Sequence, residues 1–358
     1  MLADEEQKKF VAPLLHWSKG VDRQLAWKGG TAYEVWLSEI LLQQTRLEQG
    51  RPYYDRFLAA FPTVQALAAA DISEVLLQWQ GLGYYARARN LHKAAREVME
   101  RHGGQFPTTY AEILALSGVG AYTAAAISSF VFDLPHAVVD GNVYRVLSRF
   151  FGVDLPIDTG KGQAFFAELA QRLLDKNAPA DYNQAIMDFG ALVCTPKAAR
   201  CSRCPLQGDC VAHKEQKIQF LPVKSKKIRR RSRYFYYFVY LFEDKVYLRR
   251  RPAGDIWEGL HDFPAFEVDA LLPIDEAISF APFQPEGAIL LGFSDAFKQV
   301  LTHQDIHAIF INLFLAEPLN LVSSDIFAVS SDKIGDYAQP KLILDYWQRR
   351  RQFMLPYD

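Results

Sequence analysis

The sequence predicts a protein of two domains, a mainly α-helical N-terminal domain and an α+β C-terminal domain. The chain has 358 residues, 50% of them hydrophobic, which exceeds the usual size of one domain and supplies two cores. From about Phe10 to Asp209, apolar residues recur at helical spacing between Gly, Pro and Asp residues. After Cys210, aromatic and β-branched runs predict strands.

The expected elements follow from these patterns. Helices are predicted, for example, over residues 33–49, 72–78, 86–101, 109–116, 122–130, 143–151 and 163–174. In the second half, residues 234–242 and 245–250 flank the turn Glu243-Asp244 and predict a β-hairpin. Residues 288–292 and 306–315 predict further strands, and 340–351 an amphipathic helix.

A basic stretch, residues 218–233, is the expected linker between domains 1–217 and 234–358. It includes Lys224-Ser225-Lys226-Lys227-Ile228-Arg229-Arg230-Arg231-Ser232-Arg233, and no acidic residue occurs between Glu215 and Glu243. A solvated tether and a contact with DNA phosphates explain this composition equally well.

Net charge and termini bound the class of protein. The formal net charge of −1 does not exclude a nucleic-acid binder, because phosphate binding needs only a local basic face. The N-terminal residues are acidic where a secretory signal is basic, and no apolar run reaches the length of a membrane span. We therefore expect a protein of the cytoplasm, associated with the nucleoid if it is bacterial, without a membrane partner.

The four cysteines lie in one segment, residues 194–210, with the spacing Cys-x6-Cys-x2-Cys-x5-Cys. A reducing cytosol disfavours disulfides, and this spacing differs from the paired Cys-x2-Cys knuckles of many zinc sites. From the spacing alone, an iron–sulfur cluster, a zinc ion and free thiols all remain open. The residues considered are Cys194, Cys201, Cys204 and Cys210.

Two acidic residues are candidates for catalysis. On a helix, Glu39 shares one side with Trp36, Ile40 and Gln43, where desolvation would raise its pKa and make it a general acid. An acid at the rim of an amphipathic helix is the alternative. Asp140 precedes Gly141-Asn142 and a new helix; an N-cap there stabilises by about 1 kcal/mol and would lower the aspartate pKa. A protonated acid and a fixed carboxylate together can cleave a glycosidic bond.

A glycine turn, Gly118-Val119-Gly120, lies between two apolar helical stretches. The N–H groups that open the following helix can bind a phosphate, although the same turn also fits an ordinary connection between helices.

Taken in order over about residues 10–215, these segments resemble adenine DNA glycosylases of the MutY family. The resemblance rests on the Glu39 helix, Gly81-Leu82-Gly83-Tyr84-Tyr85, Gly118-Val119-Gly120, Val139-Asp140-Gly141-Asn142-Val143, Tyr182-Asn183-Gln184-Ala185 and the four cysteines. It implies a helix-hairpin-helix DNA glycosylase fold, a 4Fe–4S cluster on the cysteines, and removal of adenine mispaired with 8-oxoguanine or guanine.

The family assigns roles to individual residues. Glu39 matches the acid that protonates the flipped adenine, and Asp140 matches the carboxylate that stabilises the sugar cation. Tyr122 stands where endonuclease III-like enzymes carry a lysine that forms a Schiff base, so the resemblance implies a monofunctional enzyme.

The resemblance also implies contacts with DNA. Some of the matching residues wedge into the duplex or touch the 8-oxoguanine strand, and two line the adenine pocket, although the segment before Glu39 is one residue shorter than usual. Basic residues between the cysteines are candidates for phosphate contacts, or form a solvated loop. The DNA-contacting candidates are Gln44, Thr45, Leu82, Gly83, Tyr84, Gly118, Val119, Gly120, Lys197, Arg200 and Arg203, and the pocket residues are Trp27 and Gln184.

The C-terminal domain resembles the family's 8-oxoguanine-reading module, which has a Nudix-like fold. Residues 251–264 carry this similarity, but the clustered acids of a Nudix metal-binding helix are missing, so we expect recognition without hydrolysis. The family's damage-reading loop, commonly Phe-Ser-His, corresponds to Leu301-Thr302-His303, with a surface hairpin as the alternative.

The expected partner is double-stranded DNA with adenine opposite 8-oxoguanine or guanine, bound by a monomer, and the resemblance allows a monovalent cation at the helix-hairpin-helix turn. Competing hypotheses are an endonuclease III-like pyrimidine or thymine-mismatch glycosylase, a non-catalytic DNA-damage sensor, and a Nudix hydrolase.

Overall fold

The structure is a computed structural model that describes residues 5–21, 29–43, 45, 47–225, 230–321 and 325–353. Its contacts divide the chain into two compact units. The helical unit consists of Met1–Ala69 and Lys93–Lys227, and the sheet unit of Ala70–His92 and Ile228–Asp358. Residues 70–92 therefore group with the C-terminal sheet, whereas the expected domain boundary lies at residue 217.

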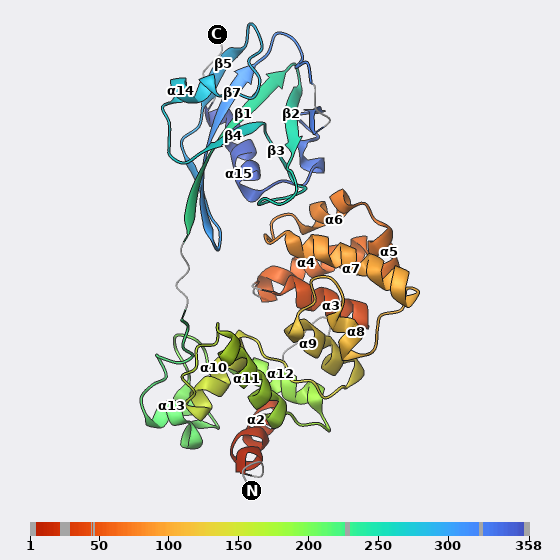
Figure 1. Ribbon diagram of the computed structural model, residues 1–358, viewed down its shortest axis with the longest axis vertical. Helices are drawn as coiled ribbons and strands as arrows, with labels where there is room; N and C mark the ends of the chain where they lie inside the picture. The colour runs from red at the N-terminus through yellow and green to blue at the C-terminus, as the bar shows by residue number, and fades with distance from the viewer. Residues whose placement is uncertain are drawn as a thin grey trace. The chain divides into compact units, whose positions relative to one another are not determined.

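The described residues of the helical unit form helices and connecting loops, without a strand, as the apolar spacing predicts (Figure 1). Its elements are η1 (Gln7–Val11), α2 (Ala12–Ser18), α3 (Ala32–Leu41), α4 (Leu47–Ala60), α5 (Val64–Ala69), most of α7 (Ala86–His102), α8 (Tyr110–Leu114), α9 (Ala121–Phe132), α10 (Gly141–Phe151), α11 (Gly160–Leu173), α12 (Pro179–Leu192), η2 (Cys201–Arg203), η3 (Gln207–Asp209) and α13 (Val211–Lys214).

The continuous helix predicted for residues 33–49 is wrong. Helix α3 ends at Leu41, and α4 begins at Leu47. A straight helix would separate residues 42 and 50 by about 12 Å, yet a Cβ atom on Gly50 would lie only 2.7 Å from Leu42 Cδ2. The chain reverses direction here because α4 packs back against the end of α3. Local spacing does not reveal this reversal, because it depends on a contact between Leu42 and Gly50, eight residues apart.

Packing in the core of the helical unit positions the helices that carry the candidate acids. Phe10 packs against Phe150 with ring centroids 4.8 Å apart, and Trp17 meets Phe189 edge-on at 5.1 Å. Helix α3 packs on α9, and α12 packs on both α9 and α10. These contacts place the N-terminal ends of α9 and α10 beside one face of α3, where the candidate acids lie. None of the described helices is long and apolar enough to cross a membrane.

The sheet unit contains one mixed sheet with the strand order β3-β2-β1-β7-β5. Strands β1 and β7 pair in parallel, β6 joins β7 as an antiparallel hairpin, and β4 and β8 pair with β1 and β2. Its elements are α6 (Ile72–Trp79), the first turns of α7, β1 (Arg231–Phe242), β2 (Lys245–Arg250), β3 (His261–Asp262), β4 (Ala265–Val268), α14 (Ile274–Ser279), β5 (Ile289–Phe293), β6 (Phe297–Val300), β7 (Gln304–Phe314), β8 (Ile326–Ser330), η4 (Ile334–Asp336), α15 (Lys341–Arg349) and η5 (Arg350–Phe353).

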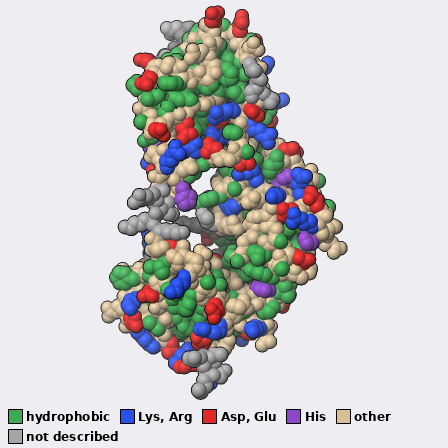
Figure 2. All heavy atoms as spheres, in the orientation of Figure 1, with side chains coloured by type: hydrophobic (Ala, Val, Ile, Leu, Met, Phe, Trp, Pro, Cys, Tyr) green, Lys and Arg blue, Asp and Glu red, His purple; other side chains and the backbone are tan. Residues whose placement is uncertain are grey.

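The predicted hairpin, later strands and C-terminal helix are confirmed. Strands β1 and β2 meet at Leu241 opposite Val246, next to the Glu243-Asp244 turn. Alternate aromatic residues of β1, Tyr236, Phe238 and Tyr240, are fully buried in the core on one face of the sheet. On the face of the molecule drawn in Figure 2, basic and acidic side chains are interspersed, in agreement with the net charge of −1.

Candidate active site

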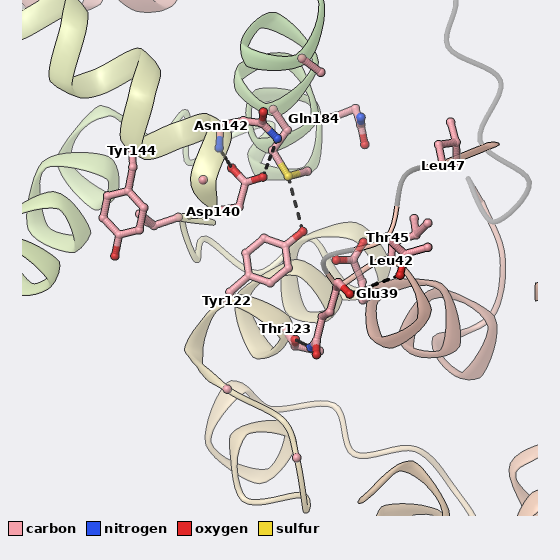
Figure 3. Close-up of a pocket in the computed structure, with 17 residues that line it drawn as sticks. Glu39, Leu42, Thr45, Leu47, Tyr122, Thr123, Asp140, Asn142, Tyr144 and Gln184 are labelled. Carbon is pink, nitrogen blue, oxygen red and sulfur yellow. Dashed lines mark hydrogen bonds between the residues drawn. The ribbon is translucent and has the colours of Figure 1, made fainter. Parts of the chain in front are cut away.

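A pocket of about 720 Å³ opens in the helical unit where α3, α9, α10 and α12 meet (Figure 3). It contains both candidate acids and Tyr122, which are separated by up to about a hundred residues in sequence. Its lining consists of Glu39, Leu42, Gln43, Thr45, Leu47, Gly118, Gly120, Tyr122, Thr123, Val139, Asp140, Gly141, Asn142, Tyr144, Gln184, Met187 and Ala191.

Glu39 projects into this pocket from α3. The helix begins with a capping box in which the Thr31 hydroxyl and the Glu34 carboxylate satisfy each other's backbone N–H groups. Glu39 follows about two turns later and is only 7% exposed. Burial raises its pKa to about 7; the Tyr122 hydroxyl opposes this increase, and the charge of Asp140 adds to it. The expected increase in the pKa of Glu39 is confirmed.

Asp140 is the N-cap of α10, as predicted, and its side chain lies in the same pocket. Asp140 Oδ1 accepts the backbone N–H groups of Asn142 and Val143 at 2.9 and 2.8 Å, and Oδ2 accepts the Asn142 amide at 2.7 Å. The predicted decrease in its pKa is wrong. Burial raises the pKa of Asp140 by more than these hydrogen bonds and Arg145 lower it, because the cap faces a pocket and not open solvent.

Arg145 holds the residue that orients Asp140. Its guanidinium donates to the Asn142 side-chain oxygen at 2.8 Å and to the carbonyl of Gly190 at 2.6 Å, while Nε donates to the Cys194 carbonyl at 2.6 Å. A Cβ atom at Gly190 would lie 2.6 Å from Asn142 Cβ, so only glycine permits this approach of α12 to α10. The amide that binds the carboxylate is therefore fixed on two sides.

Tyr122 lies in the first turn of α9, between the two acids (Figure 3). Its hydroxyl donates to the Met187 sulfur at 3.7 Å. Burial is the main cause that raises the pKa of Tyr122 well above its ordinary value, and both carboxyls contribute. The phenol stays protonated at neutral pH, and the described lining of the pocket contains no lysine that could act as an amine nucleophile.

The Gly118-Val119-Gly120 turn joins α8 to α9 at the edge of the pocket. Gly118 has a φ of +75°, which favours glycine, and the Val119 N–H donates to the Leu116 carbonyl at 3.1 Å. Glu97 anchors the turn by accepting the backbone N–H and the hydroxyl of Ser117 at 2.8 and 2.7 Å. The exposed start of α9 can therefore accept an anion.

The predicted adenine-pocket residues are only partly described. Gln184 and Thr45 line the pocket. Trp27 and Gln44 lie outside the described residues. Sequence reasoning did not assign Gln43, whose amide donates to the Thr123 hydroxyl at 3.2 Å and thereby ties the end of α3 to α9.

The predicted DNA contacts at residues 82–84 and 301–303 lie together in the sheet unit, around a second pocket of about 450 Å³. Tyr84 has a φ of +47° and is 47% exposed, whereas Leu82 is 7% exposed. The Tyr84 hydroxyl hydrogen-bonds to Thr302, in the hairpin turn between β6 and β7. Gly83, Leu301 and His303 also line this pocket. Residues 301–303, which match the family's damage-reading loop, thus form the turn of a surface hairpin.

Arg87 supports the exposed tyrosine. Its guanidinium lies 5.5 Å from the Tyr84 ring centroid and 5.3 Å from that of Trp79. Trp79 in turn donates its indole N–H to the Gly83 carbonyl at 3.1 Å. Arg87 and Trp79 therefore fix the loop before α7, while the side chain of Tyr84 is accessible to solvent.

The four cysteines form one loop beside α10 and α13. Burial raises the pKa of Cys201, Cys204 and Cys210, to about 11 for Cys204, and neighbouring thiols add to each increase. Arg149 donates to Cys194 Sγ at 3.4 Å, which is a contact suited to an anionic sulfur. In the described part of the chain, no three His, Cys, Asp or Glu side chains are arranged to hold a single metal ion. The basic residues of this loop, Lys197, Arg200 and Arg203, are exposed.

The sequence analysis missed Asn142, Arg145, Arg149 and Met187 as members of the site. Asn142, Arg145 and Arg149 recur at helical spacing along one face of α10, and this polar stripe on a helix otherwise rich in apolar residues was a usable signal. No local pattern could have indicated Met187, because its contact partner lies 65 residues away.

The helical unit and its pair of carboxylates define the class of protein. Residues 37–172 match the family model "HhH-GPD superfamily base excision DNA repair protein". An adenine DNA glycosylase of Buchnera aphidicola (subsp. Schizaphis graminum) is 35% identical over 260 residues, which cover 72% of this chain and 75% of that protein. The chain belongs to the adenine DNA glycosylase family.

Other relatives agree with this assignment. The Homo sapiens adenine DNA glycosylase is 44% identical over 220 residues, 58% of this chain and 40% of that protein. Among solved structures, a thermostable thymine-DNA glycosylase has a TM-score of 0.56 with 28% identity and covers 60% of this chain and 100% of its own. A complex of endonuclease III with DNA has a TM-score of 0.52 with 21% identity, over 60% of this chain and 99% of its own, which supports the shared fold.

Proposed function

We propose that the protein is a monofunctional DNA N-glycosylase that hydrolyses the bond between adenine and deoxyribose in mispaired duplex DNA. The observation that carries the proposal is the joint presence in one pocket of Glu39, with a pKa of about 7, and of Asp140, held by three hydrogen bonds. This pair suits a reaction that needs one proton donor and one anion. A base flipped out of the duplex can reach both.

Glu39 acts as the general acid. Protonation of the adenine ring turns the base into a better leaving group, and a carboxyl with a pKa of about 7 is protonated in about half of the molecules at neutral pH. After the base departs, the same carboxylate can accept a proton from water. The atoms balance: the C–N bond breaks, the base leaves protonated, and water supplies the hydroxyl of the sugar.

Asp140 stabilises the positive charge that develops on the sugar as the bond breaks. Its orientation is preset by Asn142 and Arg145, so no reorganisation is required at the moment of reaction. Tyr122 fills the space between the acids with a phenol that cannot form a Schiff base. The expected product is an abasic site in an intact strand.

The proposed substrate is adenine opposite 8-oxoguanine or guanine. Tyr84, Leu82, Gly83 and the turn Leu301-Thr302-His303 share one pocket of the sheet unit, which suits a reader of the opposite base. We assign the sheet unit to this role as a Nudix-like module. Duplex DNA would also contact the start of α9 and the exposed Lys197 and Arg200, where a monovalent cation at the glycine turn is a further expectation.

The cysteines fit a 4Fe–4S cluster. The donors are four thiols on one loop, and Arg149 already donates to one of the sulfurs. A cluster spreads four thiolates over several irons and does not require them to converge on one ion. When bound, it would fix the loop that carries Lys197 and Arg200. We further propose that the protein acts as a monomer in the cytoplasm.

Single-turnover release of bases tests this function. The substrates are duplexes with adenine opposite 8-oxoguanine, adenine opposite guanine, or thymine opposite guanine, each analysed with and without alkali. We expect adenine release, with strand breaks only after alkali. Glu39→Gln should abolish release, whereas Glu100→Gln, an exposed change on α7, should not.

Other outcomes would contradict the proposal in different ways. Strand breaks without alkali would indicate a bifunctional, endonuclease III-like enzyme. Release of thymine alone would favour a thymine-mismatch glycosylase, and tight binding of the lesion without any base release would favour a damage sensor.

A further inference from the structure

The hydroxyl of Tyr122 has one proton and more than one potential acceptor. In the structure this hydroxyl donates to Met187 Sδ at 3.7 Å, and the carboxyls of Glu39 and Asp140 flank the same phenol (Figure 3). A thioether is a weak acceptor compared with a carboxylate. The position of the hydroxyl proton, toward the sulfur or toward the carboxylate, therefore decides how strongly the phenol hydrogen-bonds to Glu39.

Met187 is held where it can perform this task. It lies on α12, one turn after Gln184, and its half-buried side chain lines the catalytic pocket. On the same helix, Asn183 is fully buried, donates to Ser129 and His136, and accepts the Val138 N–H. The backbone that carries Met187 is thus fixed relative to the helix that carries Tyr122.

We propose that Met187 is a positioning residue for catalysis, whose thioether accepts the Tyr122 hydroxyl and so draws its proton partly away from the Glu39 carboxylate. This inference rests on the proposed function, because it assigns Glu39 the role of general acid. Met187 is not proposed to touch the reacting atoms. It acts through the phenol.

The physical consequence is a change in how readily Glu39 holds its own proton. A hydrogen bond from Tyr122 stabilises the ionised carboxylate and lowers the pKa of Glu39. Among the described residues, the titratable groups that face Glu39 are Tyr122 from α9 and Asp140 from the start of α10, and Arg145 acts on Asp140. Without the sulfur, the phenol turns further toward the carboxylate, and Glu39 loses its proton at a lower pH.

The test is the pH dependence of single-turnover adenine release by Met187→Leu. Leucine conserves volume, so the fold should tolerate it, but it has no hydrogen-bond acceptor. We expect the alkaline limb of the profile to move to lower pH while the rate well below the Glu39 pKa is unchanged. A movement of about half a pH unit lowers the rate on that limb about three-fold.

Two control variants isolate the effect. Met99→Leu changes a methionine that is 37% exposed on α7 and should leave the profile unchanged. In a Tyr122→Phe background there is no hydroxyl to hold, so adding Met187→Leu should not move the limb further. If both controls behave in this way and the single variant moves the limb, the inference stands.

An unchanged limb in Met187→Leu, or an equal loss of rate at every pH, would overturn the inference, because the second result indicates a packing role. A limb that still moves in the Tyr122→Phe background would also overturn it. Failure of the proposed function itself is distinguishable, since it appears as adenine release that persists in Glu39→Gln.

Discussion

The two pockets of this protein hold their working groups in different ways. In the helical unit, Glu39 is buried on a face of α3, and Asp140 caps α10 and is oriented by hydrogen bonds from the backbone and from Asn142. In the sheet unit, Tyr84 and Thr302 lie on loops, and the tyrosine is half exposed and supported by stacking on Arg87. Catalysis requires fixed charges in a desolvated site, whereas reading a base requires accessible side chains.

The largest effect on the rate of adenine release is expected at Asp140, which is both charged and held in a fixed orientation. Asp140→Asn keeps the size of the side chain but removes the anion that offsets the charge on the sugar. Single-turnover adenine release should fall about 10²-fold or more, whereas the matched change Asp154→Asn at an exposed position should have no effect. Near-normal release by Asp140→Asn would show that the helical pocket does not depend on this charge.

The buried carboxyl of Glu39 is expected to lower the stability of the fold at alkaline pH. Its folded-state pKa of about 7 exceeds the reference value of 4.5, so the buried charge destabilises the fold as pH rises from about 4.5, with the full cost present above about 7. Glu39→Gln should therefore raise the free energy of unfolding at alkaline pH by up to about 3 kcal/mol and leave it nearly unchanged in acid. Denaturant titrations at both pH values check this; an equal effect at both would indicate that burial does not perturb the acid.

Substitutions in the sheet unit are expected to change the preference between mispairs more than the rate of base release. Arg87→Met removes the cation that stacks on Tyr84 and Trp79, an interaction worth about 1 kcal/mol. The preference for adenine opposite 8-oxoguanine over adenine opposite guanine should fall several-fold, while the maximal rate of release changes little. Arg96→Met, an exposed change on α7, is the control. A large loss of maximal rate would mean that the two pockets are not separable in this way.

The smallest effect is expected at the loop itself. Thr302→Val removes the hydroxyl that contacts Tyr84, which should cost about 1 kcal/mol or less in the binding of the mispair. Thr302→Ser keeps the hydroxyl and should behave like the original protein in equilibrium binding measurements. Equal losses in both variants would assign the effect to the methyl group and not to the hydrogen bond.

Local patterns predicted most of the elements but not the break between α3 and α4. The start of α10 was predictable because an aspartate before Gly-Asn is a local capping signal. The break between α3 and α4 was not, because it depends on Gly50 packing against Leu42. The grouping of residues 70–92 with the sheet unit likewise depends on contacts such as that of Tyr84 with Thr302, which are 218 residues apart.

The sequence by itself determined the helical and sheet halves, the candidate acids and the four-cysteine loop, because spacing, capping and composition are local properties of a chain. The tertiary structure alone decided the ionisation of Asp140 and the partner of the Tyr122 hydroxyl. Burial raises the pKa of Asp140 despite its cap, and the Tyr122 hydroxyl meets Met187 and not only a carboxyl. Desolvation and the choice of hydrogen-bond partner depend on which helices enclose a group, and that enclosure arises only when distant segments pack together.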